Sequence, residues 1–476
     1  YYDIISMSYL FLSCTEKKTR FTNIIQRIET MLTILGLSMI LCFMYLIMSR
    51  RLTPLVALTL IPVLFALIAY GLSFFVEGLD HIQLNELGEM MLEGVKKLAP
   101  TGVMLLFAIL YFAVMIDTGL FDPSVKWILR LVKGDPLKVV MGTITLTLIV
   151  SLDGDGSTTY MICVAAMLPL YKRLGMSPLI MACLMMLASG IMNLTPWGGP
   201  TARAASALHV DPSDVFIPMI LPMICAIFWL YFVGFMYGRM ERKRLGIVEL
   251  DVSHGDSIQI SNNPEANRAH LRWFNALLTL ALMVSLVLGI LPMSILFMIA
   301  LCIALVVNYK DIDMQKALVA SHAGSALNVV GIIFAAGIFT GILAGTGMVE
   351  AMSKELVAII PESMGPFLAP ITAIISMPLT FFMSNDAFYY GVLPILSEAA
   401  IHYGISPVEM ARASIVGQPV HLLSPLVPST YLLVGLAGIE FGAHQKFTIK
   451  WAILTCLVML AAALLFGVFP LYSTLG

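Results

Sequence analysis

Charged residues are scarce in this chain of 476 residues. Asp, Glu, Lys and Arg make up 12% of it, about half of the ~25% that is usual in soluble domains. Hydrophobic residues make up 59%, and the mean hydropathy is +0.93. Apolar runs of about 20 residues recur along the chain, and each is long enough to cross ~30 Å of hydrocarbon. The composition therefore excludes a soluble globular protein and predicts a multi-pass integral membrane protein in contact with the lipid bilayer.

Cysteine is also sparse. The seven Cys are scattered singly, with no Cys-x-x-Cys pair, which excludes a disulfide framework and a metal-thiolate site. The net charge of −2 points to no particular partner, and nothing resembles a nucleic-acid-binding module or a soluble catalytic domain. We therefore expect no nucleic-acid partner, no enzymatic activity and no permanently bound cofactor.

Two polar stretches interrupt the apolar pattern. SLDGDGST runs from Ser151 to Thr158, and NLTPWGGPTAR runs from Asn193 to Arg203. Each unpaired backbone amide or carbonyl in hydrocarbon costs several kcal/mol, so irregular backbone at this depth must be buried in protein or line a cavity. These two stretches are therefore the first candidates for a binding site.

The rest of the chain divides into apolar spans, short arms and a polar linker. The arms at 138–151 and 157–170 are each ~21 Å long as helices, too short to cross, and they flank a Gly-rich tip, which is typical of a re-entrant hairpin. The amphipathic segment 120–132 is expected at the membrane interface. A helix at 177–210 is interrupted by TPWGGP. Full spans are expected at 31–48, 54–75, 99–117, 214–237, 273–290 and 292–307.

The second half of the chain repeats the first. At a constant shift of 229 residues, Gly175–Pro178 falls on Gly404–Pro407 and Tyr160 falls on Tyr389. Such a run of matches with almost no gaps indicates an internal repeat. The remaining matches at or near this shift are Thr195-Pro196 with Ser424-Pro425, Thr201 with Thr430, Asp155-Gly156-Ser157 with Ser384-Asn385-Asp386, and 117–119 with 345–347.

Basic residues are distributed unequally between the two halves. The first interfacial segment and the turns after it carry six, whereas the matching part of the second half carries only Lys354. The positive-inside rule then has the first hairpin enter from the cytoplasm and the second from outside, although Lys96 and Lys97 count against this orientation. Inverted repeats with broken helices are the signature of secondary transporters. The predicted fold is an all-α membrane protein with two inverted repeats, each with a re-entrant hairpin and a broken helix, and about ten full spans.

This pattern divides the chain into seven segments. Residues 1–30 are polar and basic, and we expect a disordered or non-native N-terminal segment, with an ordinary cytosolic tail as the alternative. The other expected segments are N-terminal scaffold helices at 31–98, the first inverted repeat at 99–237, a cytoplasmic linker at 238–272, second scaffold helices at 273–324, the second inverted repeat at 325–447 and a C-terminal helix at 448–476.

The four breaks supply half-helix N-termini, whose free N–H groups and positive dipole ends suit anions. Asp153, Asp155 and Asp386 lie at the tips, while Arg203 is the only base near a break in the sequence. A site for a polyanion that carries no cation would need more positive charge than one Arg supplies. We therefore infer cargo that is anionic but arrives with a cation, which could be Mg²⁺, Ca²⁺, Na⁺ or a proton. The candidate metal ligands are Asp155, Asn385 and Asp386.

The candidate substrate-binding residues all lie at one of the four breaks. A competing interpretation is structural: Gly and Pro kink packed helices, hydroxyls satisfy freed carbonyls, and an Asp caps the half-helix that follows it. The candidates are Asp153, Gly154, Asp155, Gly156, Ser157 and Thr158 at the first tip, Thr195, Pro196, Gly198, Gly199, Thr201 and Arg203 at the first broken helix, Ser384, Asn385 and Asp386 at the second tip, and Ser424, Ser429 and Thr430 at the second broken helix.

These motifs resemble those of the citrate–divalent-metal:proton symporter family, a branch of the ion transporter superfamily. The resemblance is carried by Asp153–Thr158, by Leu168–Met176 and especially by Leu194–Arg203, and it covers about residues 31–476. It implies import of citrate complexed with Mg²⁺ or Ca²⁺ and driven by protons, across a bacterial plasma membrane. It also implies a homodimer in which a transport domain moves against a scaffold. Related divalent anion:sodium symporters have Ser-Asn-Thr at both tips, and the departure at Ser384–Asp386 argues against sodium coupling.

Three other functions stay open at this point. The chain could be a proton- or sodium-coupled symporter of free di- or tricarboxylates or of gluconate, whose uptake would ignore divalent metal. Two intramembrane Asp, one per half, also suggest an aspartyl protease, whose carboxylates would have to share a proton, but the Gly-x-Gly-Asp pattern of such enzymes is absent around Asp155. A sensor of the same fold would bind substrate without transporting it.

Overall fold

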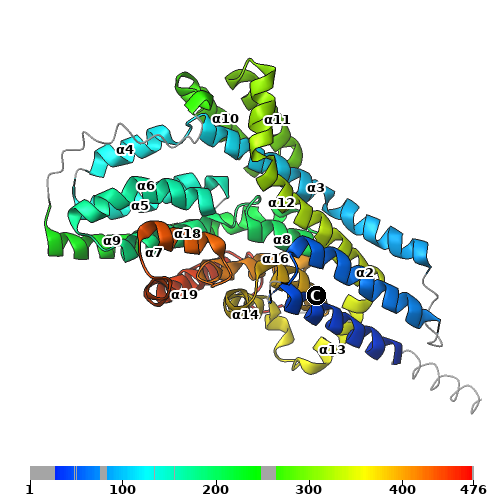
Figure 1. The fold of residues 1–476 in the computed structure, drawn as a ribbon. Coiled ribbons are helices and arrows are strands. Elements are labelled where there is room, and N and C mark those ends of the chain that lie inside the picture. Colours follow the sequence, from blue (N-terminus) through cyan, green and yellow to red (C-terminus); the bar gives the residue numbers. More distant parts are fainter. Residues whose placement is uncertain are drawn as a thin grey trace, which may run out of the picture.

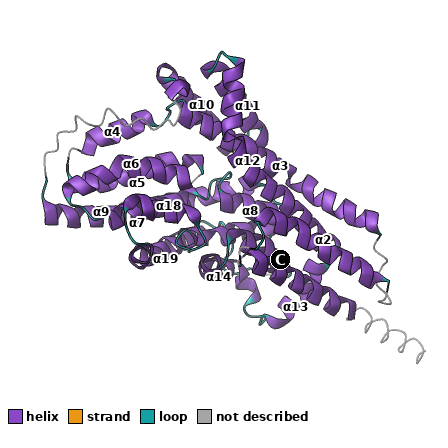
Figure 2. Cartoon of the chain, in the orientation of Figure 1, coloured by secondary structure: helices purple, strands orange, loops and turns teal. Residues whose placement is uncertain are grey.

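The computed structural model describes residues 27–47, 49, 51–74, 83–132, 134–154, 156–247 and 264–473, which form helices joined by short turns (Figure 2). The first helix spans Arg27–Ile47, so residues 27–30, which we expected in a disordered tail, begin a helix. Residues 1–26 and the candidate Asp155 lie outside the described part of the chain.

The described residues of the first half form eight further helices and one 3₁₀ turn at the first hairpin tip. In chain order they are α2 (Pro54–Ser73), α3 (Leu84–Asp117), α4 (Asp122–Val132), α5 (Pro136–Val150), the turn η1 (Ser151–Asp153), α6 (Gly156–Leu174), α7 (Pro178–Met192), α8 (Gly199–Ala207) and α9 (Pro212–Leu245).

The second half has the same kinds of element, and its second tip leads into a π-helical turn. After the turns η3 (Pro264–Ala266) and η4 (Ala269–Leu271) come α10 (Arg272–Val287), α11 (Met293–Asn308), α12 (Ile312–Gly345), α13 (Met348–Ile359), η5 (Gly365–Phe367), α14 (Leu368–Phe382), the π-helical turn η6 (Ala387–Val392), α15 (Leu393–Ile401), α16 (Pro407–Ser414), η7 (Ile415–Gly417), α17 (Gln418–His421), α18 (Pro428–Ala437) and α19 (Phe441–Leu465).

The order of helices therefore repeats along the chain. Helices α3 and α12 both have 34 residues, and they begin 228 positions apart, at Leu84 and Ile312. Helices α8 and α18 begin 229 positions apart, at Gly199 and Pro428. The shift found in the sequence thus holds for the helices themselves. The opposite orientation of the two halves in the membrane stays a prediction.

Nine helices among the described residues are long and apolar enough to cross a membrane, against about ten full spans expected. The expected span at 292–307 is α11, whose 16 residues fall short of the ~17 that a crossing needs. The expected span at 99–117 is the second half of α3, which runs unbroken through the predicted boundary at residue 98. Helix α9 likewise continues to Leu245, into the segment expected as a linker.

Buried hydrophobic side chains gather in two main clusters. One, which we call the hairpin body, comes mainly from α4–α7, α9, α14 and α16–α19. The other, the frame body, comes mainly from the first helix, α2, α3 and α10–α12. Figure 1 shows α4–α7, α9, α18 and α19 on the left, and α2 and the first part of α3 on the right. Each half of the chain contributes to both bodies, and α8 and η6 lie at their boundary, because Ala202 and Tyr390 pack in the frame cluster.

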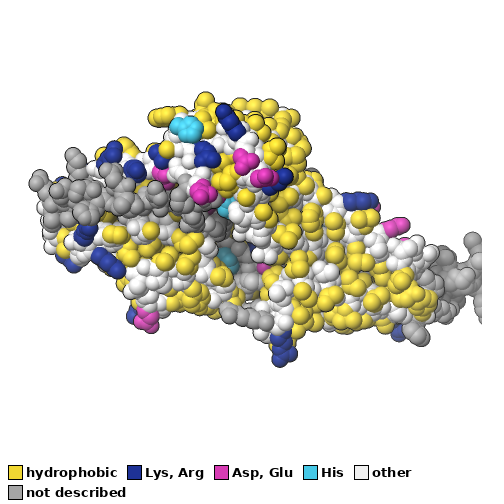
Figure 3. Space-filling view, turned by 45° about the horizontal axis from the view of Figure 1, so that its top comes forward, with side chains coloured by type: hydrophobic (Ala, Val, Ile, Leu, Met, Phe, Trp, Pro, Cys, Tyr) yellow, Lys and Arg dark blue, Asp and Glu magenta, His cyan; other side chains and the backbone are white. Residues whose placement is uncertain are grey.

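Much of the protein surface is apolar. Phe228 is 71% exposed and Leu465 is 80% exposed, and Figure 3 shows hydrophobic side chains over most of one face, with charged side chains in small groups. Monomeric soluble proteins rarely expose so large an apolar surface to water. Lipid tails are its natural neighbours.

The frame body is held together by a close crossing of α3 and α12. A Cβ atom added to Gly94 of α3 would lie 2.0 Å from the carbonyl oxygen of Gly337, and one added to Gly341 of α12 would lie 2.4 Å from the carbonyl oxygen of Met90. Gly337 and Gly341 are four residues apart, so they lie on one face of α12. Small residues at this spacing let two helix backbones approach in a membrane, where packing rather than the hydrophobic effect drives helix association. The glycines are therefore required by the crossing.

Replacing Gly94 by Ala should destabilise the frame body, because the obstructing atoms belong to the backbone and cannot rotate away. We expect a loss of ~1–3 kcal/mol, the usual cost of overpacking, measured as a lower melting temperature of the purified protein in detergent. Gly324→Ala in α12 is the matched control, since a Cβ there meets nothing within 4 Å. A Gly94→Ala protein as stable as the control would contradict the close crossing.

Candidate functional site

The four breaks meet crosswise in the structure. The second hairpin tip, at residues 383–386, faces the first broken helix through Asp386 and Arg203. The first tip faces the second broken helix, because a Cβ atom on Gly156 would lie 3.2 Å from the hydroxyl oxygen of Ser429. Each tip thus contacts the broken helix of the other half. Residues that lie more than 180 positions apart in the sequence are brought together by this arrangement.

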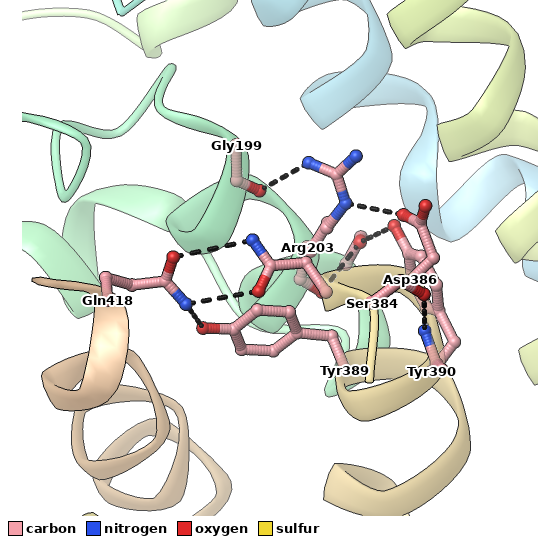
Figure 4. A network of polar contacts seen from close by, with 10 residues as sticks. Gly199, Arg203, Ser384, Asp386, Tyr389, Tyr390 and Gln418 are labelled. Atoms are coloured by element: carbon pink, nitrogen blue, oxygen red, sulfur yellow. Dashed lines mark hydrogen bonds and ion pairs between the residues drawn. The ribbon is translucent and has the colours of Figure 1, made fainter. Parts of the chain in front are cut away.

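A buried ion pair forms the centre of the site. The Arg203 Nε donates to Asp386 Oδ1 at 2.6 Å, and its Nη1 donates to the Gly199 carbonyl oxygen at 3.1 Å (Figure 4). The two side chains are 20% and 10% exposed. A buried ion pair of this kind is costly to break by removing one partner, because the other charge is then left uncompensated.

A second polar group lies beside the ion pair. Asn385 and Gln418 exchange amide hydrogen bonds of 3.3 and 3.4 Å, and Gln418 Nε2 also donates to the Tyr389 hydroxyl at 2.9 Å (Figure 4). Gln418 is fully buried. The amide of Asn385, a candidate metal ligand, is therefore held by Gln418 in this structure.

The π-helical turn η6 turns two neighbouring tyrosines toward different partners. Tyr389 contacts Gln418, whereas the Tyr390 hydroxyl lies 3.1 Å from the Ser206 Oγ of α8. The Ser206 Oγ also donates to the carbonyl oxygen of Arg203 at 2.9 Å. The start of η6 is capped by Ser384, whose Oγ accepts from the Ala387 amide at 3.2 Å. The turn thereby fixes the second tip against both broken helices, and π-helical turns occur frequently at functional sites.

The predicted threonines at the broken helices have structural partners. The Thr201 hydroxyl donates to the Leu194 carbonyl oxygen at 2.9 Å, and the Thr430 hydroxyl donates to the Leu422 carbonyl oxygen. Both threonines are fully buried. In this structure these two hydroxyls therefore satisfy carbonyls freed by the breaks, which is the structural role that we weighed against ligand binding.

Several other candidates occupy defined places at the breaks. Asp153 is 8% exposed and accepts from the Thr159 hydroxyl at 3.4 Å. A Cβ atom on Gly198 would lie 2.0 Å from the Asn193 carbonyl oxygen, so only glycine fits there. The Ser424 Oγ accepts from the Leu426 amide. Among the candidates, the partly exposed ones are Gly154, Gly156, Ser157, Thr158, Gly199, Arg203, Ser384, Asn385 and Ser429, while Thr195 and Pro196 are buried.

The described residues contain no group of three or more His, Cys, Asp or Glu side chains that could hold a metal ion. Asp386 is paired with Arg203, and Asn385 with Gln418. The sequence did not point to Gln418 or Ser206, because their partners lie in other elements. Tyr389 carried one signal, since it matches Tyr160 across the repeat.

Two hairpins and two interrupted helices that meet inside an all-helical membrane protein define a membrane transporter. The comparison with protein families narrows this class. The profile of the citrate transporter family matches residues 43–417. The chain therefore belongs to the citrate transporter family, as the motifs led us to expect, and it is a multi-pass protein of the bacterial plasma membrane.

Individual relatives agree with this assignment. The chain is 58% identical over 442 residues to a citrate transporter of Bacillus subtilis and 53% identical over 438 residues to a Mg(2+)/citrate complex secondary transporter of the same organism. Each alignment covers 92% of this chain and 99% of the relative.

Two solved structures share the fold. The MtrF protein of Neisseria gonorrhoeae matches with a TM-score of 0.62 over 89% of this chain and 97% of its own. The YdaH transporter of Alcanivorax borkumensis matches with a TM-score of 0.55 over 87% of this chain and 99% of its own. Both are 14% identical to this chain, so they support the fold alone.

The structural role of Thr201 can be tested by two substitutions. Thr201→Val should destabilise the protein by ~1–3 kcal/mol, since the Leu194 carbonyl loses its donor, whereas Thr201→Ser keeps the hydroxyl and should restore the melting temperature in detergent. If Thr201→Val keeps wild-type stability but binds substrate more weakly, the hydroxyl faces the ligand instead.

Proposed function

We propose that this protein imports citrate as a complex with Mg²⁺ or Ca²⁺, in symport with protons. The observation that carries the proposal is the Arg203–Asp386 ion pair at the meeting point of the breaks. A site with one positive and one negative group side by side suits a ligand that itself carries both signs. The 53% identity of this chain to a protein named as a Mg(2+)/citrate complex secondary transporter supports the same substrate.

The charges favour the complex over free citrate. Citrate carries about three negative charges, and a divalent cation cancels two of them. A carboxylate of the complex could replace Asp386 on Arg203 while the metal takes the released Asp386 carboxylate, so neither buried charge is left alone. Free citrate would offer Arg203 a partner but would repel Asp386 at close range. With the metal present, the exchange of one ion pair for two new contacts therefore leaves both charges compensated.

Other groups would complete the contacts to the complex. The N-terminus of α8 presents backbone amides next to Gly199, where an anion is stabilised by the helix dipole. Ser384 and Asn385 at the second tip are partly exposed beside Asp386, and their oxygens suit Mg²⁺ or Ca²⁺. Asn385 would turn from Gln418 to do so. The first tip, which also carries the candidates Gly154, Ser157 and Thr158, lies next to Ser429 of the second broken helix through Gly156.

Transport would then consist of movement of the hairpin body against the frame body. In support, the ion pair lies on α8 and just before η6, the two elements at the boundary between the bodies. In this scheme, loading with substrate and proton offsets the charges of the site so that the hairpin body can cross. The homodimer that the family resemblance implies is part of the same proposal, with the frame bodies fixed against each other.

The alternative is symport of free di- or tricarboxylate, or of gluconate, with protons or sodium. It is favoured by one observation, which is that Asp386 already has Arg203 as its cation and needs no metal. In that case a substrate carboxylate would displace Asp386, which would take a proton or a sodium ion.

Uptake of labelled citrate into proteoliposomes separates the two proposals. The protein is given an inward proton gradient, with citrate plus Mg²⁺, citrate plus Ca²⁺, or citrate plus a chelator. Symport of the complex requires both a metal and the gradient. Equal uptake in chelator would leave the free-carboxylate alternative, and no citrate uptake under any condition would refute symport of the metal–citrate complex.

Asp386→Asn should lower metal-dependent citrate uptake by at least about tenfold, because a neutral amide binds the metal weakly and leaves Arg203 without its counter-charge. Asp313→Asn is the control, since Asp313 is an acid with an 89% exposed side chain far along the chain from the site. Normal uptake by Asp386→Asn, with normal metal dependence, would remove Asp386 from the site.

A further inference from the structure

A cavity of about 350 Å³ lies between the frame body and the tip and broken helix of the second half of the chain. Its frame side is formed by Ile47 and residues 51–54, where the first helix gives way to α2, and its other side by Ser384 and Leu426. Ser384 is two residues before Asp386 at the second hairpin tip, and Leu426 lies in the second broken helix. The cavity therefore joins an exposed turn of the frame to two of the four breaks.

Arg51 gives this cavity a positive charge. It is exposed, its guanidinium lies 5.5 Å from the centre of the Tyr45 ring, and it makes no ion pair within the described residues. Other cations of the protein, such as Arg203 and Lys354, have carboxylate partners. Arg51 is thus a cation held over an aromatic ring at the edge of a cavity, with its donors available to an anion. The approach of Arg51 to the second tip could not be predicted, because residue 51 is 333 positions before Ser384.

The equivalent place in the first half of the chain is filled. The shift of 229 residues places Trp197 where Leu426 stands in the second half. Trp197 is 6% exposed, and its ring centre lies 5.4 Å from that of Phe112 and 5.1 Å from that of Phe297, both of the frame body. Its Nε1 donates to the Leu152 carbonyl oxygen at 2.9 Å. An indole therefore closes the gap between tip, break and frame that is open at Leu426.

The predicted topology indicates which side the open cavity faces. Helices α2 and α3 both count as membrane spans, so two crossings separate Arg51 from the turn before α4. The positive-inside rule places α4 on the cytoplasmic side. Two crossings return the chain to the same side, so Arg51 and the mouth of the cavity would face the cytoplasm.

We propose that this cavity is the route between the second hairpin tip and the cytoplasm, and that Arg51 binds the anionic metal–citrate complex along it. The inference rests on the proposed function for the identity of the ligand. The complex of citrate with a divalent cation carries about one negative charge, which suits a single exposed guanidinium. Trp197 fills the equivalent gap in the first half, so between these two matched positions it is the gap at Leu426 that is open.

The first test compares the two faces of the membrane. Arg51→Gln should raise the KM for Mg²⁺–citrate by about fivefold to tenfold when substrate is offered from the cytoplasmic face, since a charge at the mouth of a site chiefly sets the rate of capture. From the outer face the KM should change less than about twofold. Arg51→Lys should restore most of the cytoplasmic affinity, and raising the salt concentration should reduce the difference between wild type and Arg51→Gln.

Lys316→Gln is the matched control, because Lys316 is another exposed cation and, among the described residues, it pairs with exposed Asp313. A purely structural role for Arg51 would alter both faces equally, and that result would overturn the proposal. So would an unchanged KM on both faces.

The second test examines the cavity itself. Leu426→Cys should react with a membrane-impermeant thiol reagent from the cytoplasmic face, and Mg²⁺ with citrate should slow the reaction more than either alone. Ala202→Cys, at a residue that is 1% exposed against the frame, should stay unreactive. If Leu426→Cys reacted with the thiol reagent from neither face in the absence of ligand, the route would not be open. Reaction from the outer face would also contradict the proposal.

The two proposals fail in different ways. If the wild-type protein exchanges no citrate across the membrane, the proposed function fails, whatever the thiol labelling shows. If citrate is exchanged and metal-dependent, but Arg51→Gln behaves as wild type from the cytoplasmic face, the function stands and the role of Arg51 is refuted.

Discussion

Every backbone group that the four breaks release has to find a partner inside the protein, because hydrocarbon offers none. This constraint explains why the breaks converge. The partners are side chains of the same broken helix or of other elements: two buried hydroxyls, an indole and an imidazole donate to carbonyl oxygens at or next to the tips and breaks. The bonds are Thr201 to Leu194, Thr430 to Leu422, Trp197 to Leu152 and His421 to Thr380, with Gln445 to Leu423 from α19. A break that is satisfied in this way cannot lie at the lipid surface, so tips and broken helices are drawn to one place.

The same constraint governs the charges at that place. An isolated carboxylate within the membrane region is costly, and Asp386 is tolerated because Arg203 lies 2.6 Å away. In the pair, each of the two buried charges is compensated by the other. A ligand that separates Arg203 from Asp386 therefore has to offer each of them a new partner of opposite charge. A ligand with both a carboxylate and a metal ion meets that condition without uncovering a charge. The substrate preference that we propose thus rests on the energetics of the Arg203–Asp386 pair as much as on family membership.

The sequence predicted the features that depend on local composition. Gly, Pro and Asp in apolar surroundings located the breaks, and the repeat at a shift of 229 recurred in the starts of α8 and α18 at Gly199 and Pro428. Features that depend on packing between distant segments were missed. The first part of α3 carries several charges, so hydropathy did not identify it as a continuation of the span. Neither the bond of Gln418 to Asn385 nor the direct pairing of Arg203 with Asp386 could be predicted, because each joins two halves or two elements whose approach is set by tertiary packing.

The repeat also shows where the packing of the two similar halves differs. If both halves had the same residues between break and frame, both gaps would be filled or both would be open. Trp197 and Leu426 occupy equivalent positions, yet the indole packs between Phe112 and Phe297 while the smaller leucine borders a cavity. The difference in side-chain volume at this one pair of positions leaves one gap filled and the other open. On the proposed function, the hairpin body would have to withdraw the indole from its aromatic partners to open the other side. Each such aromatic contact contributes about 0.5–1.5 kcal/mol, so the cost of opening would be within reach of the binding energy of a substrate.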